Sequence, residues 1–144
     1  MKIIVSACLL GENCKYSGGS NRSEAVISFV RGHDVIPVCP EVLGGLDTPR
    51  VPSEILNGQV INKNGESVDA QFRAGALAAF EKAGRGGADL AILKSRSPSC
   101  GKSRIYDGSF SATLTDGNGV FAQMLIDAGI RVVSEEELNL LSHE

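Results

Sequence analysis

The sequence predicts an α/β fold: a single domain with a mostly parallel sheet and helices on both faces, in a Rossmann-like three-layer arrangement. Short apolar runs rich in β-branched residues alternate with helical segments, which is typical of βα units. The runs show no strict alternation of apolar and polar residues, as expected for strands covered on both faces. At 144 residues the chain has the length of one domain, so residues 1–144 are predicted to form a single unit.

The first half of the chain is predicted to hold two strands, a helix and a small β excursion. Residues 2–7 form the first strand and residues 34–38 the second, with Pro37 placing the second near an edge or a strand end. Between them, Asn21 is expected to cap a helix that stops at Gly32, with Glu24 three residues after the cap. Residues 59–62 and a turn at 63–66 indicate the small β excursion.

The second half continues the alternation of helix and strand. A long helix is expected from residue 67 to 83, then a third strand at 89–93 and a polar, turn-rich segment at 105–111. A helix over residues 118–128 precedes the fourth strand at 130–133. Ser134 with Glu137 then forms a capping box that opens a terminal helix.

Composition narrows the classes of function. A hydrophobic content of 42% with 22% charged residues is ordinary for a soluble globular protein. The net charge of -3 argues against non-specific nucleic-acid binding, which needs a basic surface. The chain starts with a strand rather than a signal peptide, and no apolar run is long enough for a membrane span, so we expect a cytoplasmic protein. His33 and His143 are predicted to be solvated rather than metal ligands.

Three cysteines follow apolar runs. Cys8, Cys39 and Cys100 lie at or just past the predicted strand ends, which meet at one edge of a parallel sheet. We therefore expect the three thiols to converge, and Cys14 could reach the same place from its loop. The chain has no C-x2-C pair, so the prediction depends on topology. Three thiolates suit a soft metal or an iron–sulfur cluster, and on a cubane they leave one iron open.

Other groups lie near these thiols in the sequence. Glu41, two residues after Cys39, is a candidate general acid/base or else a solvated surface carboxylate. Ser95, Ser97 and Ser99 offer hydroxyl groups near Cys100. The alternative is that these serines are there only because serine favours loops. The cations expected to surround the Cys100 thiol and lower its pKa are Lys94, Arg96, Lys102 and Arg104.

Three separated segments resemble one known family. The first is residues 6–11 with Cys14, Tyr16 and residues 18–20, and the second is residues 38–46 with residues 48–50. The third is residues 94–95 and 97–101 with residues 105–108. Together they resemble the DUF523 family of small bacterial proteins, which includes the thiouracil desulfurases, and the resemblance covers essentially the whole chain.

The resemblance implies an enzyme that removes sulfur from a small thiolated base without net redox change and releases sulfide. It implies that Cys8, Cys39 and Cys100 hold a [4Fe-4S] cluster and that Glu41 and Ser97 are the catalytic pair. A thiocarbonyl sulfur would meet the open iron while Glu41 assists proton transfer. Ser99 is equally close to Cys100 in sequence and stays an alternative hydroxyl, and Cys14 receives no role.

Two other functions stay open at this point. One is a non-catalytic carrier or sensor that binds a metal or an iron–sulfur cluster. The other is a cofactor-free thiol enzyme that uses Cys100 as its nucleophile. A carrier does not need Glu41, whereas a cofactor-free enzyme needs an activated Cys100 thiolate.

Overall fold

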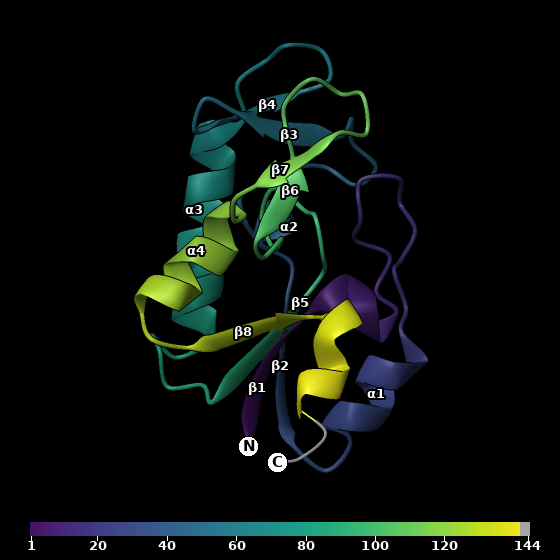
Figure 1. Cartoon of the computed structure of the whole chain (residues 1–144), viewed down its shortest axis with the longest axis vertical. Helices are drawn as coiled ribbons and strands as arrows, with labels where there is room; N and C mark the ends of the chain where they lie inside the picture. Colours follow the sequence, from purple (N-terminus) through teal and green to yellow (C-terminus); the bar gives the residue numbers. More distant parts are fainter. Residues whose placement is uncertain (142–144) are drawn as a thin grey trace.

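A four-stranded sheet forms the centre of the computed structural model, which describes residues 1–141 (Figure 1). The strand order is β2-β1-β5-β8, and all three pairings are parallel. The bounds of the strands are β1 Lys2–Ser6, β2 Asp34–Val38, β5 Leu90–Leu93 and β8 Arg131–Ser134. The predicted parallel sheet is confirmed, and Pro37 lies in an edge strand as expected. His143 lies outside the described residues.

Helices cover both faces of the sheet, which confirms the predicted three layers. One face carries α1 (Glu24–Val30) and the 3-10 helix η2 (Glu135–Leu141), with Ile3 and Val5 of β1 packed in that layer. The other face carries α3 (Asp69–Lys82) and α4 (Val120–Asp127), packed against Ile4 and Ala91. Successive residues of β1 therefore enter opposite cores, as strands covered on both sides require.

The first helix begins later than the sequence predicts. Ser23, not Asn21, is the N-cap of α1, and its side-chain oxygen accepts a hydrogen bond from the Val26 N–H at 3.2 Å. The Asn21 amide instead donates to the sulfur of Cys8 at 3.5 Å. Serine and asparagine are comparable helix caps, so the tertiary contact with Cys8 decides which of the two caps the helix.

Two β-hairpins lie beyond the carboxyl edge of the sheet, in the upper part of Figure 1. Strand β4 (Gln59–Asn62) confirms the predicted excursion and pairs with β3 (Ser53–Leu56), which the sequence did not predict. The second hairpin pairs β6 (Arg104–Tyr106) with β7 (Leu114–Asp116), and the segment expected to be polar and turn-rich, 105–111, covers the end of β6 and most of the connection to β7. The two hairpins touch through β3 and β6 and stand over the strand ends.

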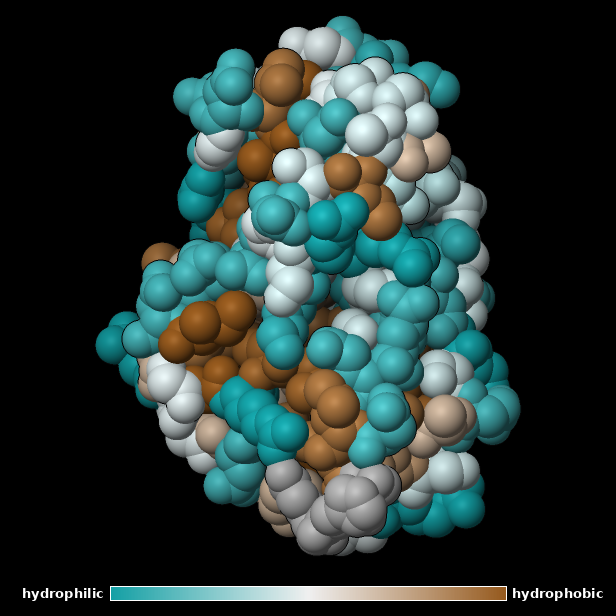
Figure 2. Space-filling model, viewed as in Figure 1, coloured by the Kyte–Doolittle hydropathy of each residue, from teal (hydrophilic) through white to brown (hydrophobic). Residues whose placement is uncertain are grey.

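The face seen in Figure 2 gathers hydrophobic surface in its lower half, around α4, β8 and η2. Ile126 of α4 and Leu140 of η2 are among the large apolar residues that stay exposed. In residues 1–141, no helix combines the length and the apolar character needed to cross a membrane.

Candidate active site

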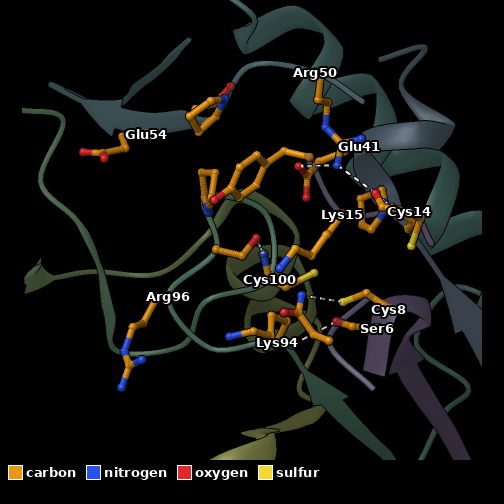
Figure 3. Close-up of a pocket in the computed structure, with 18 of the residues that line it drawn as sticks. Ser6, Cys8, Cys14, Lys15, Glu41, Arg50, Glu54, Lys94, Arg96 and Cys100 are labelled. Carbon is orange, nitrogen blue, oxygen red and sulfur yellow. Dashed lines mark hydrogen bonds and ion pairs between the residues drawn. The ribbon is translucent and has the colours of Figure 1, made fainter. Parts of the chain in front are cut away.

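Three thiols reach one cavity from three neighbouring strand ends. Cys8 lies in the 3-10 helix η1 (Ala7–Leu10) directly after β1, and Cys39 lies between β2 and α2 (Pro40–Leu43). Cys100 lies in the loop that follows β5. Because β2, β1 and β5 are adjacent and parallel, these ends share the carboxyl edge of the sheet. All three residues line a cavity of about 480 Å³ (Figure 3), so the predicted convergence is present.

A fourth thiol belongs to the same cavity. Cys14 lines it, and its backbone carbonyl oxygen accepts a hydrogen bond from the Cys39 thiol at 3.7 Å. The interaction between the two side chains lowers the pKa of the Cys39 thiol to about 7 and raises the pKa of Cys14. The two thiols are thus unequal, with Cys39 the one more readily ionised.

Burial dominates the chemistry of the other two thiols. It raises the pKa of Cys8, and the hydrogen bond from Asn21 offsets part of that rise. It also raises the pKa of Cys100, which is 5% exposed, and the interaction with the Ser6 side chain offsets part of that rise. The expectation that nearby cations lower the pKa of Cys100 is therefore wrong, because desolvation of its thiolate raises the pKa and the charge of Glu41 raises it further. A cofactor-free enzyme with Cys100 as an activated thiolate gains no support.

Only two of the four predicted cations reach this cavity. Lys94 and Arg96 line it, with the Lys94 ammonium 3.4 Å from Glu135. Lys102 and Arg104 lie beyond the turn at Gly101 and line a smaller cavity of about 260 Å³ instead. There Lys102 lies 3.8 Å from Glu137, and Arg104 of β6 pairs with Asp116 of β7 at 2.9 Å.

Glu41 lies in the first turn of α2 and faces the cavity (Figure 3). Its Oε2 atom is 3.0 Å from the guanidinium of Arg50, and its side chain is only 19% exposed. The alternative of a solvated surface carboxylate is therefore wrong.

Two glycines allow α2, the helix that carries Glu41, to pack closely against α3. A Cβ on Gly75 would lie 1.8 Å from the carbonyl oxygen of Pro40, and one on Gly44 would lie 2.0 Å from the carbonyl oxygen of Gln71.

Ser97 and Ser99 differ in their access to the cavity. Ser97 lines it, and its Oγ atom accepts hydrogen bonds from the N–H groups of Ser99 and Cys100, both at 3.0 Å. Ser99 is fully buried and does not belong to the cavity lining, and its hydroxyl has no partner in the part of the chain that is described. The geometry thus favours Ser97 as the hydroxyl that can meet a ligand.

Comparison with known proteins identifies the family of this chain. The family model for 2-thiouracil desulfurase matches residues 3–137. This chain belongs to the 2-thiouracil desulfurase family. The Bacillus subtilis (strain 168) protein YbbK, itself uncharacterized, is 40% identical over 147 residues, which cover 95% of this chain and 97% of YbbK. A solved structure of the [4Fe-4S]-dependent thiouracil desulfidase TudS matches with a TM-score of 0.89 and 40% identity, over 98% of this chain and 95% of that one.

The chemistry of these thiols fits an iron–sulfur cluster, because thiolates are the soft ligands that hold its irons. Among residues 1–141, no three His, Cys, Asp or Glu side chains are grouped to hold one metal ion. In a cubane each thiolate binds a different iron, so its ligands lie farther apart than the ligands of one ion. Three soft donors from separate strand ends around a common cavity match that need.

Several cavity residues carry charges or aromatic rings that the sequence did not assign to the site. Arg50 and Glu54 are the two most strongly bonded of them: Arg50 bonds Glu41, and Glu54 accepts hydrogen bonds from Gly108 and Phe110. Arg50 ends the second family motif, which signalled its importance, whereas Glu54 lies four residues beyond the motif. Nothing in the sequence identified the partners of either side chain. The others in the lining are Lys15, Tyr16, Lys63, Tyr106 and Phe110.

Proposed function

We propose that this protein is an iron–sulfur-dependent desulfurase that converts the thiocarbonyl group of a thiolated nucleobase, such as thiouracil, into a carbonyl group and releases sulfide. The observation that carries the proposal is the meeting of Cys8, Cys39 and Cys100 with Glu41 in one cavity. Membership of the 2-thiouracil desulfurase family and the likeness to TudS support the same reaction.

In this proposal Cys8, Cys39 and Cys100 hold a [4Fe-4S] cluster. A bound cluster supplies an iron without a protein ligand, which polarises a thiocarbonyl group as a Lewis acid. The protein surrounds this position with a cavity of about 480 Å³, which falls in the usual size range for small-molecule sites. The cavity therefore suits a free small base as the substrate.

Glu41 and Ser97 then act on the attacking water. The carboxylate of Glu41 accepts a proton from water as the water oxygen bonds to the ring carbon. Ser97 Oγ already accepts two backbone hydrogen bonds, so its own O–H stays available to donate to the substrate or the water. The carbon–sulfur bond breaks, and the sulfur leaves with the two protons of the water as hydrogen sulfide. No electrons are gained or lost.

Anaerobic reconstitution tests the proposal. Loaded protein should contain about four iron and four sulfide per chain and should release sulfide from 2-thiouracil or 4-thiouracil. Glu41→Ala should keep the iron and lose most, but not all, of the sulfide release. A loaded protein that leaves every thiolated base unchanged would instead be a cluster carrier or sensor, and its Glu41→Ala variant would be indistinguishable from the wild type.

We further propose that residues 1–144 form one domain that works in the cytoplasm. In support, elements from the beginning, middle and end of the chain pack on the same four-stranded sheet. All four cysteines are free thiols, the state typical of a reducing compartment.

A further inference from the structure

Arg50 links the first two family motifs around the cavity. Its Nη2 atom donates to Oε2 of Glu41 at 3.0 Å and to the carbonyl oxygen of Cys14, also at 3.0 Å. Its backbone N–H donates to the carbonyl oxygen of Tyr16 at 2.7 Å. We propose that Arg50 is the positioning residue for Glu41, and this inference rests on the proposed function.

The guanidinium group is fixed on both of its outer nitrogens. Besides the two bonds of Nη2, Nη1 donates to the carbonyl oxygen of Asp47 at 3.1 Å and to Oγ1 of Thr48 at 3.0 Å. The Arg50 side chain is only 10% exposed. Four bonds with little solvent access leave the group one orientation, so the atom that meets Glu41 has a defined place.

This arrangement makes the two oxygens of the Glu41 carboxylate different. Oε2 is held by Arg50, while no protein donor within residues 1–141 bonds Oε1. Figure 3 shows the Glu41 carboxylate between Arg50 and the interior of the cavity. Arg50 therefore stops rotation of the carboxylate and leaves one oxygen for water. A general base has to stand within hydrogen-bond reach of the proton it takes.

The bonds of Arg50 need a planar fork of donors. Nη1 and Nη2 each serve two acceptors, and the four acceptors come from Glu41, Cys14, Asp47 and Thr48. Lysine has one nitrogen with three protons and cannot reproduce this geometry. We therefore expect Arg50→Lys to behave more like Arg50→Ala than like the wild type.

A double-mutant cycle tests the inference. The kcat of sulfide release is measured for wild type, Arg50→Ala, Glu41→Gln and the double variant, each with its iron content and melting temperature. We expect Arg50→Ala to lower kcat by roughly 100-fold, as misplacement of a catalytic group does. In the Glu41→Gln background the same change should lower kcat less than about threefold, because the two residues act as one unit. Iron content should stay that of the wild type.

Two further measurements separate positioning from general support of the fold. Added guanidinium ion at millimolar concentration should restore at least about tenfold of the kcat lost by Arg50→Ala, since it can refill the same place. Arg73→Ala is the matched control: Arg73 pairs with Asp69 and with the Gly58 carbonyl oxygen outside the cavity, so its removal should leave kcat unchanged. Equal losses from Arg50→Ala in both backgrounds would overturn the inference.

Failure of the inference is distinguishable from failure of the proposed function. If wild-type protein releases no sulfide from any thiolated base, the proposed function fails. Crystal structures of wild type and Arg50→Ala then decide the inference alone. We expect the Glu41 carboxylate to leave its wild-type position in the variant, and an unmoved carboxylate would overturn the role given to Arg50.

Discussion

The side-chain oxygen of Ser97 accepts a hydrogen bond from the backbone N–H of Cys100 at 3.0 Å. The same oxygen accepts from the N–H of Ser99, and the Gly101 N–H bonds the Ser97 carbonyl oxygen at 2.8 Å. Ser97 therefore shapes the turn that presents the Cys100 thiol, in addition to any direct role toward a substrate.

Ser97→Ala should weaken this turn. It removes the acceptor of two N–H groups, and each such group left unpaired when buried costs about 1–3 kcal/mol. We expect a lower free energy of unfolding in urea and faster loss of iron from loaded protein. Ser97→Thr, which keeps the hydroxyl, is the control and should retain its iron. An alanine variant with wild-type stability would show that the turn forms without the serine.

Ser99→Ala, unlike Ser97→Ala, should not lower the free energy of unfolding. The Ser99 hydroxyl is fully buried and has no partner within the described residues, so its removal eliminates a desolvated polar group. We expect an unfolding free energy equal to that of the wild type or higher by up to about 1 kcal/mol, with sulfide release unchanged. Loss of sulfide release in this variant with normal iron content would contradict the prediction and favour Ser99 as a catalytic hydroxyl.

The sequence predicted those parts of the site that depend on the topology of the sheet. Cys8, Cys39 and Cys100 follow apolar runs, and parallel strands bring such ends together wherever they lie in the chain. It could not predict the partner of Arg50, because Cys14 and Glu41 are separated from it by loops whose paths depend on tertiary contacts.

Short or polar elements were missed for a similar reason. The strands β6 and β7 have three residues each, and of these only Ile105 is buried. Such strands carry little hydrophobic periodicity, and their pairing depends on the neighbouring hairpin. Lys102 and Arg104 were expected near Cys100 but line the smaller cavity. The chain turns away from Cys100 at Gly101, and the sequence does not show the direction of that turn.

Gly75→Ala should displace the helix that carries Glu41. A Cβ at this position would lie 1.8 Å from the carbonyl oxygen of Pro40, so α2 has to move away from α3. We expect a large loss of stability, about 1–3 kcal/mol as for other overpacked sites, and a fall in sulfide release. Leu77→Ala on the same helix, where the side chain is 53% exposed, should stay close to wild type in both measurements.

Ser23→Ala and Asn21→Ala should separate helix capping from the contact with Cys8. Ser23 caps α1, so its replacement should lower the unfolding free energy by about 1 kcal/mol. Asn21 donates to the Cys8 sulfur, so its replacement should leave helix stability nearly unchanged. In loaded protein it should lower the reduction potential of the cluster, since hydrogen bonds to the sulfurs tune that potential. Voltammetry and urea unfolding of both variants check these two roles. A loss of helix stability in Asn21→Ala, or a lower reduction potential in Ser23→Ala, would contradict them.

Glu54 should hold the loop after β6 in a fixed conformation. The carboxylate is buried, and its Oε1 atom accepts from the N–H groups of Gly108 and Phe110 at 2.9 and 3.1 Å. The loop supplies Phe110 to the cavity wall. Glu54→Ala leaves both N–H groups without their acceptor, at a cost of about 1–3 kcal/mol each when buried, whereas Glu54→Gln keeps an oxygen there. We expect amide hydrogen exchange at Gly108 and Phe110 to accelerate in the alanine variant and to stay slow in the glutamine variant. Equally slow exchange in both variants would mean that the loop is held by its own contacts, such as the Asp107 N–H to Thr113 carbonyl bond at 3.0 Å.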